Sequence, residues 1–226
     1  MVTKAQRSPS LPILLSLNAG YIDTVGFLAL HGLFTAHVTG NLVTLGASLA
    51  LGISGVVAKI LAVPVFCILV IGARLFALRQ AEMKLPGLRI MLAAKVLLLT
   101  GGAGMALRYG PFPNGDSVAA IATGMLLVAA MAIQNAAHRI YFAQMPPTTM
   151  MTGTTTQIMI DIADLFQGLA PEASASAVPR LRRMSTTVIT FATGCGAAAL
   201  LYATVGIWCF VVLPVIGVGI LLLDLD

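Results

Sequence analysis

Two polar, glycine-containing sequences stand at matching places in the two halves of an otherwise apolar chain. The first half contains Thr39-Gly40-Asn41, and the second half contains Thr152-Gly153-Thr154. Threonine and asparagine side chains donate and accept hydrogen bonds, and glycine allows close backbone approach. Polar, glycine-bearing interruptions at corresponding positions of a duplicated membrane protein are typical of a transporter binding site. These six residues are therefore candidate substrate-binding residues.

Asp23 is the strongest single candidate for a functional residue. It lies about 12 residues into the first apolar segment, or about 18 Å along a helix, well inside a hydrocarbon core about 30 Å thick. An ionisable group at this depth is a functional-site hypothesis by default. The alternative is a structural carboxyl, either protonated or satisfied by N–H groups, that holds the break at Thr39-Gly40. Desolvation would favour the protonated acid and allow a proton-coupled role.

Gln134 and Asn135 occupy the corresponding place in the second half. Two interpretations stay open for them, contact with a substrate or hydrogen bonding to the opposite broken segment, because interhelical hydrogen bonds are common in membranes. Thr39 and Thr152 are predicted to cap the short helices that follow them, through their side-chain oxygens. If both helix starts point toward the centre, their positive dipole ends converge there and favour an anion or a carboxylate.

Other polar residues give weaker signals. His31 and His37 flank the first break, and no histidine pair has the spacing of a zinc site, so we interpret both as interfacial side chains. Asp161 and Asp164 share one helix face, and we expect them to pair with cytoplasmic arginines rather than to line a vestibule. We expect no metal, no cofactor and no nucleic-acid partner. The chain has no nucleotide-binding or metalloprotease motif, and we expect it not to be an enzyme.

The composition is that of an integral membrane protein. Apolar residues make up 58% of the chain and charged residues 9%, whereas soluble domains have about 25% charged residues. Several apolar segments reach the roughly 20 residues needed to cross a bilayer. We predict an all-α polytopic membrane protein that forms one membrane domain over residues 1–226. The apolar segments are 11–31, 41–53, 55–78, 88–107, 117–141, 150–168, 184–204 and 205–223.

The basic residues distinguish between two topologies. If every apolar segment spans, seven basic residues lie inside and six outside. If 41–53 and 150–168 instead enter the membrane and return to the same side, only Lys59 and Arg108 lie outside and eleven basic residues are cytoplasmic. That bias favours six transmembrane helices plus two short re-entrant helices, with both termini cytoplasmic. The eleven are Lys4, Arg7, Arg74, Arg79, Lys84, Arg89, Lys95, Arg139, Arg180, Arg182 and Arg183.

This topology implies an inverted internal repeat. Each half then has three spans, an odd number, so the halves insert with opposite orientation about a pseudo-two-fold axis in the membrane plane. Repeat 1 covers about 11–107 and repeat 2 about 117–223, and the proline- and glycine-rich loop 109–116 joins them outside. Residues 169–183 are predicted to be a polar cytoplasmic linker.

The sequence around the two breaks resembles a known family. Residues 20–28 and 32–41 are similar to the first signature of the YoaK-like family of small bacterial membrane proteins, a domain of unknown function numbered 1275. Residues 132–136 and 148–154 are similar to its second signature. His37-Val38 departs from the family, which more often has a methionine just before Thr-Gly-Asn, and His138-Arg139 is also less typical. The resemblance implies an inner-membrane protein of about six spans, without an established substrate or activity.

Together these features predict a small secondary transporter or channel-like carrier in the bacterial inner membrane. Asp23 would be the coupling or substrate-contacting carboxylate at a central site where the two Thr-Gly breaks meet. We expect a small-molecule or ion substrate, either an anion or a zwitterion, and a homodimer, because six short spans bury little surface. The alternative is a non-transporting scaffold, assembly factor or sensor. The remaining residues expected to line the site are Thr39, Asn41, Gln134, Asn135, Thr152 and Thr154, with the backbone N–H groups of Gly40 and Gly153.

Overall fold

The computed structural model describes residues 10–168 and 171–223, and these residues form helices joined by loops. The all-α class predicted from the sequence is confirmed. In chain order the elements are α2 (Ser10–Ala29), α3 (Gly40–Leu51), α4 (Val56–Glu82), α5 (Gly87–Tyr109), α6 (Val118–Tyr141), α7 (Met151–Phe166), α8 (Pro171–Val205), the 3₁₀ helix η1 (Gly206–Val211) and α9 (Val212–Leu221).

Five stretches of helix are long and apolar enough to cross a membrane. They are Ser10–Ala29, Val56–Glu82, Gly87–Tyr109, Val118–Tyr141 and Ser176–Leu221. Exposed aliphatic side chains such as Ile68, Ile71 and Leu75 run along α4, where a soluble protein would carry polar groups. The chain is therefore a multi-pass membrane protein.

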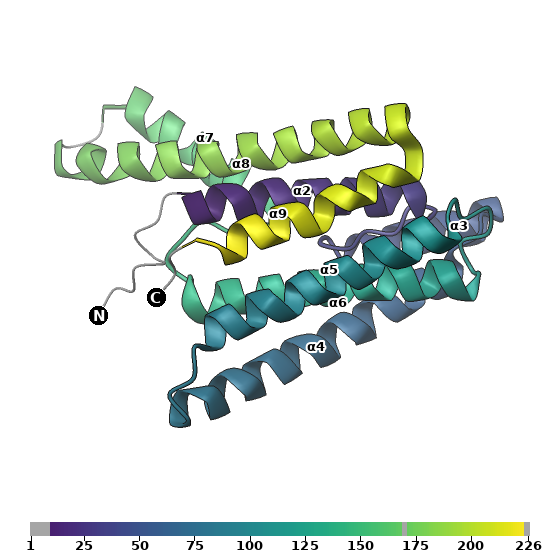
Figure 1. Cartoon of the computed structure of the whole chain (residues 1–226). Coiled ribbons are helices and arrows are strands. Elements are labelled where there is room, and N and C mark those ends of the chain that lie inside the picture. Colours follow the sequence, from purple (N-terminus) through teal and green to yellow (C-terminus); the bar gives the residue numbers. More distant parts are fainter. Residues whose placement is uncertain (1–9, 169–170, 224–226) are drawn as a thin grey trace.

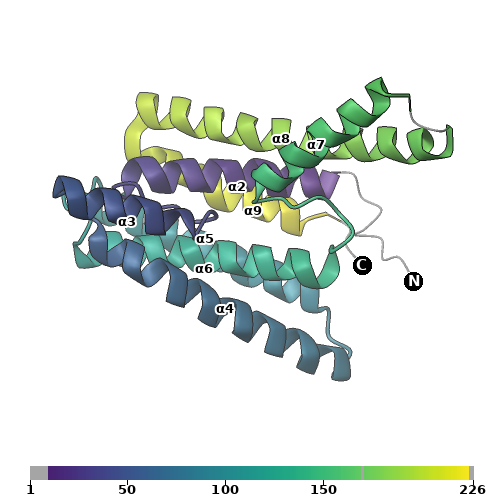
Figure 2. The same cartoon turned by 180° about the vertical axis from the view of Figure 1, so that it is seen from behind.

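The long helices lie side by side and alternate in direction (Figure 1). The last apolar stretch reverses at η1, so that α9 runs back antiparallel to α8 (Figure 1). The two short helices lie at opposite ends of the molecule. Both begin near its middle, and α3 runs toward the end that contains η1 whereas α7 runs toward the other end (Figure 2).

The backbones of α2 and α8 are in direct contact. A Cβ atom added to Gly20 of α2 would overlap the backbone carbonyl oxygen of Phe191, and one added to Gly194 of α8 would overlap the carbonyl oxygen of Leu17. Small residues allow this approach, which is the usual means of packing helices in a membrane. Gly194 is therefore a position where α8 packs closely on α2.

The polar stretch 169–183 is not a linker over its described part, because α8 already begins at Pro171. Residues 169 and 170 lie outside the described residues. A proline is well suited to a helix start, and Arg180 holds this part of α8 to α7. Its Nη2 lies 2.7 Å from Oδ1 of Asp161, and its Nε lies 2.9 Å from Oδ2. The expected pairing of Asp161 with an arginine is thus confirmed.

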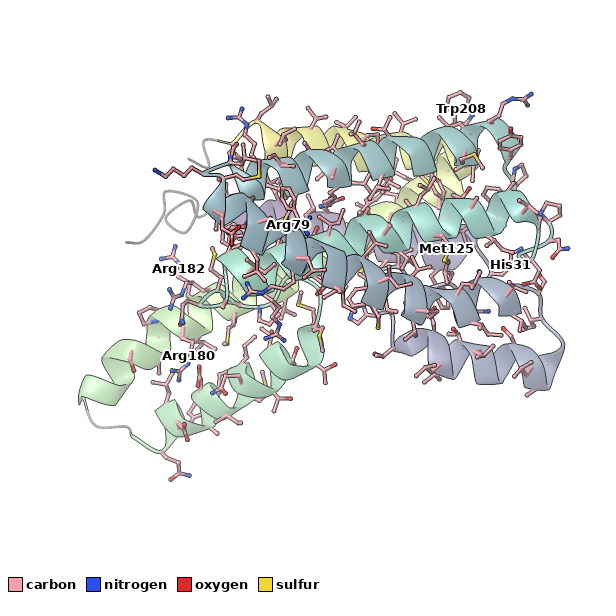
Figure 3. All side chains as sticks on the ribbon, turned by 90° about the horizontal axis from the view of Figure 1, so that it is seen from below. His31, Arg79, Met125, Arg180, Arg182 and Trp208 are labelled. Carbon is pink, nitrogen blue, oxygen red and sulfur yellow. The ribbon has the colours of Figure 1, made fainter. Side chains whose placement is uncertain are left out.

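Two arginines of α8 lie at the end of the molecule opposite to η1. Arg180 and Arg182 lie at one end, and His31 and Trp208 lie at the other (Figure 3). The hydrogen bonds from Arg180 hold the pKa of Asp161 below its usual value. At the end of the molecule that contains Arg180, an ion pair therefore joins α7 to α8.

Candidate functional site

The carboxylate of Asp23 holds the first break in place. One oxygen, Oδ1, accepts hydrogen bonds from the backbone N–H groups of Thr35 and Ala36, both at 2.7 Å. The hydroxyl of Thr35 lies 3.4 Å from the same oxygen. Irregular backbone needs such partners wherever water is excluded. This geometry matches the structural interpretation of Asp23, but it occupies only one of the two carboxylate oxygens.

The second oxygen of Asp23 binds His37. Nδ1 of His37 lies 2.6 Å from Oδ2, and 35% of the His37 side chain is exposed against 6% of the Asp23 side chain. Beside an ionised carboxylate Nδ1 carries a hydrogen and donates it, so Nε2 is the atom that binds or releases a proton. The ring also packs edge-on against Phe34 and Phe191. His37 is therefore the partly exposed partner of a buried carboxylate, and its position at a membrane interface stays a prediction.

A cavity of about 560 Å³ borders this pair. Its walls come from α2, the break, the start of α3 and α8. The size and the mixture of aromatic walls with a few polar groups are typical of small-molecule sites. The lining residues are Asp23, Thr24, Phe27, Leu28, Phe34, His37, Thr39, Gly40, Phe191 and Cys195.

The hydrogen-bonding groups at the start of α3 are satisfied by residues of the turn that precedes it. The side chain of Asn41 donates from Nδ2 to the carbonyl of Phe34 at 2.7 Å, and its Oδ1 accepts from the N–H of Phe34 at 2.8 Å. The N–H of Gly40 donates to the carbonyl of His37 at 2.8 Å. Thr39 is the N-cap residue, but within the described residues its side chain makes no capping hydrogen bond. The predicted side-chain cap is wrong because the preceding turn already satisfies these N–H groups.

At the second break, Gln134 and Asn135 bind the segment that follows α6. Nε2 of Gln134 donates to the hydroxyl of Thr148 at 3.2 Å and to the carbonyl of Leu15 at 3.0 Å. Oδ1 of Asn135 accepts from the hydroxyl of Thr149 at 2.7 Å. Both side chains therefore bind the broken segment of their own half, rather than the opposite one.

In both breaks, the hydrogen-bonded side chains are separated by the same number of residues. Asp23 binds His37, and Gln134 binds Thr148, in each case across 14 residues. In each half, a polar group within a long helix thus anchors the chain where it turns back.

The second Thr-Gly sequence lies inside a helix rather than before it. Met150 is the N-cap of α7, which begins at Met151, so the cap predicted at Thr152 is wrong. Thr152 lines a separate hollow of about 710 Å³ along α7. Gly153 is exposed, and Thr154 is buried and donates to the carbonyl of Met150 at 3.4 Å. The cavity beside Asp23 and the hollow beside Thr152 share no lining residue.

Two lysines that the sequence analysis used only to assign topology are buried in the structure. Lys59 and Lys95 are each only 1% exposed. Nζ of Lys59 donates to the carbonyl of His31 at 2.7 Å and to the hydroxyl of Ser48 at 2.6 Å. Nζ of Lys95 lies 2.5 Å from Oε1 of Gln134. Placing Lys95 at the cytoplasmic surface was wrong, and its position well inside the segment 88–107 was the signal that could have corrected it.

Stability should depend on pH through His37. The hydrogen bond to Asp23 raises the pKa of His37 above its ordinary value, although burial opposes this. A raised folded-state pKa stabilises the folded protein fully below the unfolded value of about 6.5, and the contribution is lost as pH rises through the folded value. We expect the melting temperature of the wild type to fall toward that of His37→Gln as pH rises above about 6.5. A difference between the two proteins that stays constant with pH would contradict this.

The comparisons with known proteins identify a family but add no activity. A family model described as "Protein of unknown function (DUF1275)" matches residues 11–223. No curated protein and no solved structure matches the chain. Within residues 10–168 and 171–223, no three His, Cys, Asp or Glu side chains are grouped so as to hold a metal ion.

Proposed function

This chain belongs to the DUF1275 family of proteins of unknown function, and we propose that it is a small proton-coupled carrier that binds its solute beside the first break. The observation that carries this proposal is the Asp23–His37 pair on the wall of the 560 Å³ cavity. A carboxylate with a purely structural role needs only the hydrogen bonds that it accepts from the backbone N–H groups of Thr35 and Ala36. The added histidine provides a proton-binding atom next to a space of ligand size.

We infer that the chain crosses the membrane six times and that α3 and α7 are half-helices. The directions of the long helices support this, because α8 and α9 are antiparallel and the short helices begin near the middle of the molecule (Figures 1 and 2). Half-helices that start at the bilayer midplane are typical of secondary transporters with inverted repeats.

The helix contacts fit an inverted repeat. If α2 to α5 correspond to α6 to α9, then the contact of α4 with α6 corresponds to that of α8 with α2. In the same way the contact of α3 with α4 corresponds to that of α7 with α8. Each half therefore packs its third helix on the first helix of the other half, as a pseudo-two-fold axis requires.

Cysteine labelling tests this topology. Leu85 lies between α4 and α5, Ile53 lies between α3 and α4, and both are exposed. In cells expressing Leu85→Cys, an impermeant maleimide is expected to label the protein only after the membrane is permeabilised. Ile53→Cys should react in intact cells, and the wild type measures the background from its own cysteines. Labelling of Leu85→Cys from outside would contradict the proposed orientation, in which both termini face the cytoplasm of a bacterial cell.

The competing function is a non-transporting scaffold, assembly factor or sensor in which the polar groups only hold the helices together. The hydrogen bonds of Asn41, Gln134 and Asn135 to neighbouring backbone and hydroxyl groups favour that role for those three side chains. They do not account for the exposed part of His37 or for the adjoining cavity. The carrier therefore explains more of the first break than the scaffold does.

A ligand screen separates the two functions. The melting temperature of the purified full-length protein is measured with inorganic anions, organic acids, amino acids and metal ions, beside Asp23→Asn and His37→Gln. A ligand that binds only the folded state raises the melting temperature by mass action. We expect one solute class to stabilise the wild type but neither variant. A matched variant away from the cavity, Thr156→Ala on the exposed face of α7, should respond like the wild type. No stabilisation of the wild type by any class would favour the scaffold.

A further inference from the structure

A buried ammonium without a carboxylate partner lies beside the second break. Nζ of Lys95 lies 2.5 Å from Oε1 of Gln134, and no carboxylate in the described part of the chain pairs with it. A lysine ammonium has three N–H donors. An uncompensated charge in the interior is costly, so such groups are normally paired or bind an ion.

Gln134 is held in one orientation by the protein around it. Its Nε2 donates to the carbonyl of Leu15 on α2 and to the hydroxyl of Thr148 after α6. These two bonds fix the amide nitrogen, and so they turn Oε1 toward Lys95. One donor of the ammonium is satisfied in this way, and the other donors remain for a ligand.

Additional polar groups near Leu15 also lack partners. Both amide atoms of Asn18 and the hydroxyl oxygen of Ser16 are buried with no hydrogen-bond partner among residues 10–168 and 171–223. Both residues lie on α2 within one turn of Leu15, to which Gln134 is bonded. Native proteins rarely leave buried polar atoms unpaired, and bound water or an ion is a common explanation.

A narrow crevice adjoins this network. It does not admit a water molecule in this conformation. Leu15 and Thr148 belong both to the crevice and to the hydrogen-bond network of Gln134. The other lining residues are Leu11, Pro12, His138, Phe142 and Met145. Since Leu11 and Pro12 are at the start of α2, the crevice lies at that end of the molecule and adjoins the network at Leu15 and Thr148.

We propose that Lys95 and Gln134 form an internal site for a small monovalent anion, such as a halide or a short carboxylate. The ammonium supplies the charge, and the fixed amide of Gln134 positions it. As a statement about transported substrate this inference rests on the proposed carrier, because it names an anion as the solute that moves with the proton held by Asp23 and His37. Anion binding itself can be measured without transport.

Anion binding is tested with purified full-length protein at constant ionic strength. Sodium gluconate, whose anion is a bulky polyhydroxy carboxylate, is replaced stepwise by sodium chloride or sodium formate. We expect a saturable rise in melting temperature of about 5 °C at saturation for the wild type, and no rise for Lys95→Met. Lys59→Met is the matched control, because Lys59 is equally buried but already donates to His31 and Ser48. Lys59→Met should keep the rise. Equal rises in Lys95→Met and the wild type would overturn the proposal.

Gln134→Glu provides a second test that does not depend on how Lys95→Met folds. A glutamate at this position would place a fixed carboxylate beside Lys95, in the place of a bound anion. We expect this variant to lose its response to chloride and formate. Its melting temperature in gluconate is not the readout, because glutamate also loses the Nε2 donations to Leu15 and Thr148. An unchanged response to chloride would contradict the anion site.

The anion site and the carrier can fail separately. If chloride stabilises the wild type through Lys95 but reconstituted protein moves no solute, the carrier is wrong and the binding site remains. If transport depends on Asp23 and His37 while Lys95→Met still binds chloride as the wild type does, the carrier remains and this inference is wrong.

Discussion

Gly194→Ala is expected to destabilise the folded protein by about 3 kcal/mol or more. Overpacking a core usually costs about 1–3 kcal/mol. Here the added methyl group would overlap the carbonyl oxygen of Leu17, which is backbone and cannot rotate away. The only relief is to move α8 away from α2, and this would loosen the contact around Gly20 as well. The free energy of unfolding, measured by titration with sodium dodecyl sulfate in mixed micelles, would report the effect.

Gly196→Ala is the matched control for this prediction. Gly196 lies on the same helix, and no described heavy atom lies within 4 Å of a Cβ placed there. The substitution should be neutral or stabilise α8 by up to about 1 kcal/mol, because alanine is the better helix former. Equal destabilisation by the two alanines would mean that the close packing of α2 on α8 does not determine stability.

Asp23→Leu should lower the free energy of unfolding by about 3–5 kcal/mol, because it leaves buried groups without their charged partner. The N–H groups of Thr35 and Ala36 would lose their acceptor, and the Nδ1 hydrogen of His37 would lose its own. Leucine has a similar volume, so the loss would come from hydrogen bonds rather than from a void. The same titration with sodium dodecyl sulfate measures it.

Asp23→Asn separates the two functions of this side chain. Asparagine keeps an oxygen that can accept from Thr35 and Ala36, but its amide nitrogen cannot accept from His37. We expect a smaller loss of about 1.5–3 kcal/mol, the value of one hydrogen bond to a charged group. If leucine and asparagine destabilise the protein equally, the carboxylate does not hold the break.

The helices could be predicted from the sequence because a bilayer constrains them so strongly. The segments 41–53 and 150–168 correspond to α3, Gly40–Leu51, and α7, Met151–Phe166. In these cases apolar runs and polar interruptions are enough to locate helix ends. The stretch 169–183 was predicted wrongly because its polarity suggested a loop, whereas helix α8 begins at Pro171 and is tied to α7 through Arg180.

The polar residues at the two breaks could be recognised from the sequence, but their hydrogen-bond partners could not. Asp23 stood out because it is an ionisable residue far inside an apolar segment. Its bond to His37 depends on the path of the loop between them, and no local spacing rule describes a loop that turns back on its own helix. Lys95 was missed for a different reason. It was counted only to assign topology, although it also lies inside an apolar segment, as Asp23 does.

The most direct test of the carrier is solute-driven proton movement in proteoliposomes that enclose a pH-sensitive dye. Chloride, formate and neutral solutes are applied as gradients to vesicles containing the wild type, Asp23→Asn or His37→Gln, with protein-free vesicles as the baseline. We expect one of these gradients to change the internal pH faster with the wild type than with either folded variant. The carrier would be contradicted if wild-type vesicles behaved like protein-free ones for every solute, or if both variants moved protons as fast as the wild type.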